Sequence, residues 1–413
     1  MNPSPLGSDT GVELQIPTGD AAKSMTESSE ESARQTNSRL GWPLTIATGF
    51  ALVLLSFSIW AFWTIAFDPK GIDFVSFWAA GRMVISGHPA AAYDIAAHRG
   101  LELTVAGDTG LMPFPYPPPF LLILTPFAVG SFAVAFMCWD VITGTLYALA
   151  AKRVAPLPYV LANPPVLTAC MIGQSSLLIC AVMIFGLMSV STSPFVAGAV
   201  LGLSIIKPQL ALLLPVAMIA GRRWRVIMGA VTSSVIVSLL ALLILGADTY
   251  RGFFAIIPQY VGYLRDARWQ WSQIASVFAF LRYFGASASV ALAVQGFVAL
   301  GAAATVALAW ARDWENKIPI LAAATLLTSA YLFTYDAVLL ILPAGVLIAQ
   351  CRFRSLLILW VLAALPVLQA YGLYYGPNTV PFAAILSVGL LAAPRLKRQM
   401  PSTPIEETTP SLT

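Results

Sequence analysis

Long runs of residues without a charged side chain dominate the sequence. Residues 41–67, 154–206 and 355–394 contain no Asp, Glu, Lys or Arg. A helix needs about 20 apolar residues to cross the hydrocarbon core of a bilayer, because each residue advances it by about 1.5 Å. The runs lack the strict alternation of barrel strands. Since only helices and closed barrels satisfy the backbone in lipid, the pattern predicts an all-α polytopic membrane protein.

Proline, glycine and polar residues interrupt some of these runs. The breaks at Asn163-Pro-Pro, Gly173-Gln-Ser-Ser and Thr192-Ser-Pro predict several short helices in place of two long ones. Residues 355–394 are long enough for an out-and-back pair of helices. Whether residues 119–130 cross the membrane or only dip into it stays open. We expect 10 to 12 spans in all, estimated from about 20 residues each.

Basic residues gather in short clusters between the apolar runs. Lys and Arg are enriched in cytoplasmic loops, so each cluster is predicted to be cytoplasmic. Both termini are therefore expected in the cytoplasm, with an even number of spans in an inner (plasma) membrane. The clusters are Arg34 and Arg39; Arg222, Arg223 and Arg225; Arg352 and Arg354; and Arg395, Lys397 and Arg398.

The same pattern divides the chain into a membrane domain and two tails. Residues 1–40 are rich in Ser, Thr, Glu, Gly and Pro and are predicted to be a disordered cytoplasmic tail. Residues 41–395 form the transmembrane domain, and residues 396–413 form a second cytoplasmic tail. Within the domain, residues 68–117 and 248–287 are predicted to be external loops.

Composition excludes several classes of protein. Hydrophobic residues make up 58% and charged residues 10% of 413 positions, which is incompatible with a water-soluble domain. The formal charge of +4 is too small to indicate a nucleic-acid partner, and membrane lipids are the expected surroundings. The four cysteines have no Cys-x-x-Cys spacing, so neither a disulfide framework nor a zinc site is indicated.

The first predicted external loop concentrates ionisable residues. Asp73 opens a short aromatic segment where the chain leaves the bilayer, so its carboxylate is expected to face water or a polar cavity. A helix N-cap that bonds the amide of Ser76 is the alternative for Asp73. Asp94 is open to the same cap or turn interpretation. His88 and His98 are too few and too far apart for a metal site and are expected to face solvent.

Three ionisable residues lie inside the apolar body, where a charge costs about 2.5 to 3.5 kcal/mol. Continuous helices would place Lys207 about 22 Å and Asp336 about 24 Å from the cytoplasmic ends of their helices, and so at one depth. The two could form a structural ion pair or line a polar cavity open to the outside, and both alternatives stay open. Asp140 is as consistent with a structural role as with a functional one.

Seven short motifs occur in an order that resembles the bacterial family 87 glycosyltransferases, polytopic enzymes with the GT-C fold. The resemblance covers residues 42 to 395. The segment before Tyr335 departs from the pattern because it lacks a Ser-Pro pair. The motifs are Asp73-Phe with Ala80-Gly81, Gly87 with Ala92-Tyr-Asp94, Tyr116-Pro-Pro118, Gly173-Gln174, Lys207-Pro208, Arg222-Arg-Trp224 and Tyr335-Asp336.

The resemblance implies transfer of a hexose, typically mannose, from a polyprenyl-phosphate donor to a lipid or glycan acceptor on the extracytoplasmic face. It implies that Asp73 is the general base and that Lys207 contacts the donor phosphate. The chemistry of an inverting single displacement also requires stabilisation of the departing phosphate, which we expect from Lys207 with Arg82 as a helper. Further donor contacts are expected from Gln174, Tyr116 and Asp336. Acceptor or loop contacts are expected from Asp94, His88 and Trp271.

Two other functions are compatible with charges inside a membrane. A transporter or flippase of lipid-linked sugar would use them, but such proteins place their sites near the midplane on paired broken helices. A non-catalytic membrane subunit would leave Asp73 and Lys207 without a task. No cofactor is predicted, and whether the reaction needs a divalent metal stays open.

Overall fold

The computed structural model describes residues 43, 45–53, 56, 72–108, 112–265, 271–369 and 372–392. Both predicted tails and most of the predicted first span lie outside these ranges. Most of the described residues are helical, and the one strand-like contact among them is an isolated antiparallel bridge between Ile274 and Phe333. The predicted all-α architecture is confirmed.

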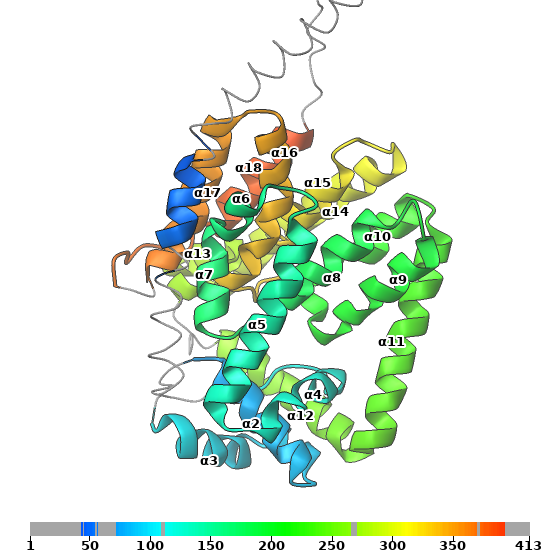
Figure 1. Ribbon diagram of the computed structural model, residues 1–413, viewed down its shortest axis with the longest axis vertical. Coiled ribbons are helices and arrows are strands. Elements are labelled where there is room, and N and C mark those ends of the chain that lie inside the picture. The colour runs from blue at the N-terminus through cyan, green and yellow to red at the C-terminus, as the bar shows by residue number, and fades with distance from the viewer. Residues whose placement is uncertain are drawn as a thin grey trace, which may run out of the picture.

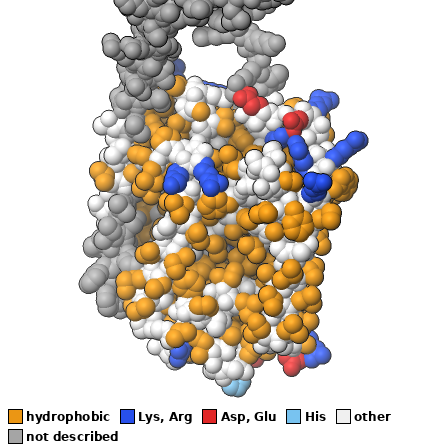
Figure 2. Space-filling view, turned by 45° about the vertical axis from the view of Figure 1, so that its right-hand side comes forward, with side chains coloured by type: hydrophobic (Ala, Val, Ile, Leu, Met, Phe, Trp, Pro, Cys, Tyr) orange, Lys and Arg blue, Asp and Glu red, His pale blue; other side chains and the backbone are white. Residues whose placement is uncertain are grey.

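Three of the described helices are long and apolar enough to cross a membrane. They are α5 (Phe132–Ala151), α11 (Trp224–Leu245) and α14 (Ala288–Ala311). Figure 1 shows α5 and α11 running between two groups of shorter helices at opposite ends of the molecule. The space-filling view shows an apolar band between two ends where charged side chains gather (Figure 2). This distribution is the one expected of a protein surrounded by lipid.

The uncharged run after Val154 is broken into short helices, as its proline and glycine positions predict. The breaks coincide with Asn163, Gly173 and Ser193. Residues 119–130 contain no helix long enough to cross a membrane, because the seven-residue helix at this position advances only about 10 Å. The helices in this part of the chain are α4 (Pro118–Leu124), α6 (Leu157–Leu161), α7 (Pro164–Met171), α8 (Ser176–Met188) and α9 (Pro194–Gly202).

One predicted helix is not regular. The chain from Lys207 to Arg222 consists of a 3-10 turn, η4 (Pro208–Leu210), and a short helix, α10 (Leu213–Ala220). Lys207 itself is outside both, with φ −139° and ψ 70°. The residue before a proline is disfavoured in the helical region, and Pro208 follows directly. Lys207 therefore sits at a break between η3 (Leu203–Ile206) and η4.

The first predicted loop is a packed helical unit. It contains α2 (Phe74–Ile85), η1 (Pro89–Tyr93) and α3 (Ile95–Ala106), which lie at one end of the molecule beside α4 (Figure 1). Phe77 makes edge-to-face contacts with Phe114, Tyr116 and Phe120, with ring centroids 5.1 to 6.3 Å apart. These contacts anchor α2 against the chain that leads into α4.

The second half of the chain is also built from helices. The predicted second external loop is largely helical, and residues 355–394 hold the expected pair of helices. The elements are α12 (Ala247–Arg265), η5 (Trp271–Gln273), α13 (Val277–Tyr283), α15 (Lys317–Thr325), η6 (Thr334–Leu340), α16 (Ile341–Ala349), α17 (Phe353–Gln369) and α18 (Val380–Ala392).

Glycines allow α9 and α11 to pack with their backbones in close contact. A Cβ on Gly198 would lie 1.9 Å from the carbonyl oxygen of Val226, and one on Gly229 would lie 2.0 Å from that of Phe195. Small residues at such crossings are typical of helices in lipid, where association depends on close van der Waals contact.

We therefore expect Gly198→Ala to lower the free energy of unfolding by about 1–3 kcal/mol, because the two helices must separate. The effect is measured by thermal unfolding of the detergent-purified protein, with size-exclusion chromatography as the readout. Gly296→Ala in α14 is the matched control, since nothing lies within 4 Å of its added Cβ. Equal stability of the two variants would contradict the close packing of α9 on α11.

Candidate active site

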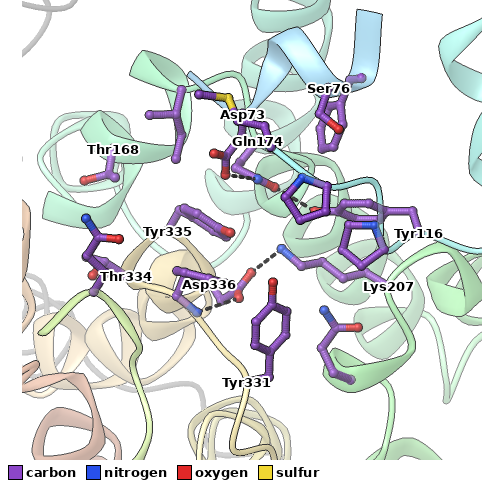
Figure 3. A pocket seen from close by; sticks show the side chains of 18 of the residues that line it. Asp73, Ser76, Tyr116, Thr168, Gln174, Lys207, Tyr331, Thr334, Tyr335 and Asp336 are labelled. Carbon is purple, nitrogen blue, oxygen red and sulfur yellow. Dashed lines mark hydrogen bonds and ion pairs between the residues drawn. The ribbon is translucent and has the colours of Figure 1, made fainter. Parts of the chain in front are cut away.

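A single cavity of about 710 Å³ brings together five of the residues that the sequence singles out. Its walls come from the start of α2, the segment before α4, the turn between α7 and α8, the break at Lys207, and α12, α17 and residues 329–336. Figure 3 shows several of these side chains converging from different elements. The five predicted residues are Asp73, Tyr116, Gln174, Lys207 and Asp336.

Gly173 determines where Asp73 lies. Its φ of +66° is a left-handed conformation that glycine adopts without strain, and an added Cβ would lie 2.6 Å from that of Phe74. The turn before α8 can therefore approach the start of α2, where the amide of Phe74 donates to the carbonyl of Ile172 at 3.0 Å. This contact places Gln174 beside Asp73.

The Asp73 side chain does not cap α2, so the N-cap interpretation is wrong. The amide of Ser76 donates to the backbone carbonyl of Asp73 at 3.1 Å, and the carboxylate makes no cap hydrogen bond. Oδ2 instead accepts from Nε2 of Gln174 at 2.5 Å. The Gln174 Oε1 in turn accepts from the hydroxyl of Tyr116 at 2.9 Å. The carboxylate is thus held by a side-chain network inside the cavity.

The surroundings of Asp73 make it a stronger base than an ordinary carboxylate. Burial raises its pKa above the usual value, while the hydrogen bond from Gln174 and the charge of Lys207 lower it, and burial prevails. Asp73 lies outside the three long apolar helices and directly precedes α2. Its ionised fraction is lost as the pH falls through this raised pKa, so any role as a base weakens in acid.

Lys207 and Asp336 form a buried ion pair that also lines the cavity. Lys207 Nζ donates to Asp336 Oδ1 at 2.5 Å and to Ser176 Oγ at 2.9 Å, and both charged side chains are almost fully buried. The Ser176 hydroxyl donates to the same carboxylate oxygen at 2.6 Å. The amide of Phe333 donates to Oδ2 at 3.1 Å. The ion pair is therefore confirmed, and both of its residues also line a polar cavity. The two residues are in contact, although neither lies on the continuous helix that the sequence predicts.

Four of the predicted residues are absent from the described lining of the cavity. Arg82 lies at the other end of α2, over the ring of Trp78 at 5.5 Å. His88 is exposed. Asp94 caps α3 by accepting from the amide of Ala97 at 2.8 Å. Trp271 stacks beneath Arg282 at 5.2 Å.

The expectation that His98 faces solvent is wrong. The side chain is 2% exposed, because α3 folds back on α2 and turns it inward. Its Nε2 lies 3.0 Å from Ser76 Oγ and 3.4 Å from Glu102 Oε1. The spacing of His98 and Glu102, four residues apart on one helix face, was the available signal.

The structure adds cavity residues that the sequence reasoning missed, chiefly aromatic and amide side chains. They had no distinguishing signal, since aromatic residues are common throughout the apolar runs. Asp140 lies outside the described lining, buried and with neither carboxylate oxygen hydrogen-bonded to a described residue. The added lining residues include Gln209, Tyr260, Gln273, Ser329, Tyr331 and Thr334.

The described residues contain no group of three or more His, Cys, Asp or Glu side chains that could hold a metal ion. Two carboxylates, Asp73 and Asp336, reach the cavity, and Asp336 is committed to Lys207. The cavity therefore presents the Asp73 carboxylate, which is hydrogen-bonded by Gln174 and Tyr335, and the Lys207–Asp336 ion pair.

A family model for glycosyltransferase family 87 matches residues 114–351, which is more than half of the chain. The chain belongs to glycosyltransferase family 87. A search of curated proteins and a search of solved structures gave no match. The family 87 match includes Tyr116, Gln174, Lys207 and Asp336. Asp73 lies before the matched range, and it is the fold that brings it to the same cavity.

The Lys207–Asp336 pair supports a stability prediction. Lys207→Met should destabilise this family 87 protein by about 3–5 kcal/mol, because it leaves a buried carboxylate without its partner. The double variant Lys207→Met/Asp336→Leu should recover most of that loss, because an apolar pair removes the stranded charge. Thermal unfolding in detergent provides the measurement.

Lys317→Met is the matched control for this series. Lys317 also pairs with an aspartate, Asp313, but Asp313 is 68% exposed. Exposed pairs contribute about 0–1 kcal/mol. If Lys207→Met costs no more than Lys317→Met, or if the double variant is no more stable than the single one, the buried pair does not support the fold.

Proposed function

We propose that this glycosyltransferase moves a hexose, with mannose as the first sugar to test, from a polyprenyl-phosphate donor to a hydroxyl of a lipid or glycan acceptor. The observation that carries the proposal is the position of the Asp73 carboxylate. It lies in one cavity with the buried Lys207. A base and a cation facing one cavity are what an inverting sugar transfer requires.

In the proposed reaction Asp73 accepts the proton of the acceptor hydroxyl. The acceptor oxygen forms a bond to the anomeric carbon as the bond from that carbon to the phosphate oxygen breaks, and the electron pair leaves with the phosphate. A single displacement of this kind inverts the anomeric carbon. The hydrogen bond from Gln174 holds the carboxylate in place, and its raised pKa favours proton transfer.

Lys207 would stabilise the departing phosphate. In the described structure its charge is shared with Asp336, which orients the ammonium beside the ring of Tyr335 at 4.8 Å. Tyr331 also lines the cavity and carries a hydroxyl group. Charge-assisted and neutral hydrogen bonds in a site sheltered from water would stabilise the charge that develops on the leaving oxygen.

The character of the walls favours a lipid-linked donor. Ile257 and Val261 of α12 and Pro366 of α17 give part of the cavity an apolar surface. The described lining contains one lysine and no arginine, and that lysine is already paired. A nucleotide diphosphate would bring more negative charge than such a lining can neutralise. A single phosphodiester that links the sugar to a prenyl chain fits this lining better.

We further propose that the cavity opens to the extracytoplasmic side. The helices α2 and α3 lie at the end of the molecule opposite α15, α16 and α18 (Figure 1). The basic cluster at Arg222 precedes α11, whose other end leads to α12. Because basic clusters favour the cytoplasm, α2 and α3 are assigned to the outside.

Reporter tags test this assignment. A tag after residue 40 and another at residue 400 should report cytoplasm, and a tag at residues 100 to 110 should report the outside, by protease or cysteine-labelling accessibility in intact cells. A cytoplasmic signal from the tag at residues 100 to 110 would refute it, since the acceptor site would then face the wrong compartment.

The general-base assignment is tested by Asp73→Asn. Asn keeps an oxygen that can accept from Gln174, so the protein should remain folded, whereas the proton acceptor is lost. A positioned base contributes about 10²- to 10⁴-fold in rate, so turnover should fall at least about a hundredfold with donor affinity little changed. The assay follows radiolabelled mannose from polyprenyl-phosphate mannose into membrane lipid extract.

Asp94→Asn is the matched control, because Asp94 caps α3 and Asn caps about as well as Asp. It should turn over at the wild-type rate. Near wild-type transfer by Asp73→Asn would show that Asp73 is not the base.

A further inference from the structure

A buried polar cluster that the proposed reaction does not use lies directly behind α2. It consists of Ser76, His98 and Glu102, which are 3%, 2% and 1% exposed. Ser76 alone of the three lines the cavity. Glu102 is held by the amide of Met112 at 3.3 Å and by Arg99 at 3.5 Å. Burial of two ionisable side chains next to a substrate cavity calls for a physical reason.

The hydrogen of the His98 ring can be assigned from its neighbours. Nε2 faces the Glu102 carboxylate at 3.4 Å, and a bare nitrogen lone pair there would be repelled. Nδ1 has no hydrogen-bond partner among the described residues, so an N–H at that position would be a buried donor left unpaired. Both arguments place the hydrogen on Nε2. His98 therefore donates to Ser76 Oγ, which lies 3.0 Å away.

This assignment leaves the Ser76 hydroxyl hydrogen free to point into the cavity. A serine hydroxyl has one donor and two acceptor positions, and His98 occupies an acceptor position. Ser76 follows Asp73 by one helical turn, so the two side chains are neighbours on one face of α2. Both are labelled at the same side of the cavity in Figure 3. A hydrogen-bond donor thus stands beside the proposed general base.

We propose that Ser76, oriented by His98, binds the oxygen next to the reacting hydroxyl, and that the acceptor is a sugar or polyol with adjacent hydroxyls. The reacting hydroxyl donates to Asp73 while its neighbour accepts from Ser76. An isolated alcohol could satisfy Asp73 alone and would leave Ser76 without a partner. A site built to hydrogen-bond a substrate oxygen discriminates against ligands that lack it. This inference rests on the proposed function, because it assumes that the acceptor binds at Asp73.

The test measures binding, so it does not depend on turnover. Methyl α-mannoside and its four monodeoxy analogues are titrated calorimetrically into the full-length protein in lipid nanodiscs. For wild type, loss of one particular hydroxyl should weaken binding about tenfold, the value of one hydrogen bond. In Ser76→Ala the same deoxy analogue should bind as well as the parent sugar, because the partner is already gone.

Three further variants distinguish a positioning role from a structural one. Ser76→Thr keeps the hydroxyl and should retain the selectivity of wild type. His98→Gln keeps an N–H donor and should retain most of it, whereas His98→Phe should lose selectivity at the same hydroxyl only. Size-exclusion profiles and thermal unfolding of all variants report whether each is folded.

The outcomes are distinct. Selectivity for one hydroxyl that disappears in Ser76→Ala and survives in Ser76→Thr supports the proposal. No binding of the sugars by wild type, or the same deoxy preference in wild type and Ser76→Ala, overturns it. If sugar selectivity behaves as expected but polyprenyl-phosphate mannose yields no product, the donor part of the proposed function fails while the acceptor inference stands.

Discussion

The buried ion pair of Lys207 and Asp336 is the interaction on which the rest of the site depends. It joins three segments that are far apart in sequence, since Ser176 bonds both partners. A charge in an apolar interior is tolerated only when it is paired and hydrogen-bonded, so the three segments cannot separate without stranding one of these groups. The turn at Gly173, the break at Lys207 and the start of η6 are held together in this way.

Helix α2, which belongs to the predicted first external loop, completes the site from the opposite side. The contact between Phe74 and Ile172 joins α2 to the same turn that carries Gln174 and leads to Ser176. Asp73 therefore occupies a position defined by the membrane helices, although it lies before the part of the chain that matches the family 87 model. Gly173 allows both contacts, since a larger residue would collide with Phe74.

Helix irregularity is what makes the cavity polar inside an apolar protein. Lys207 lies between two 3-10 turns, and Asp336 lies within η6. The start of a helix leaves backbone amides without a partner inside the helix, and here the amide of the N-cap residue Phe333 holds Asp336. Non-helical backbone at membrane depth is tolerated where it lines a cavity and is shielded from lipid.

The sequence by itself determined the class of the molecule and many of its elements. Uncharged runs require helices because lipid offers the backbone no other partner, and Pro, Gly and Asn marked the breaks in residues 154–206. The charges at Lys207 and Asp336 predicted a polar site because their burial is costly. The tertiary structure alone decided whether Asp73 capped a helix or faced Gln174, that Arg82 lies away from the cavity, and that His98 is buried behind Ser76. The local sequence pattern predicts the face of its own helix on which a residue lies. These three outcomes depend on which other segment packs against that face.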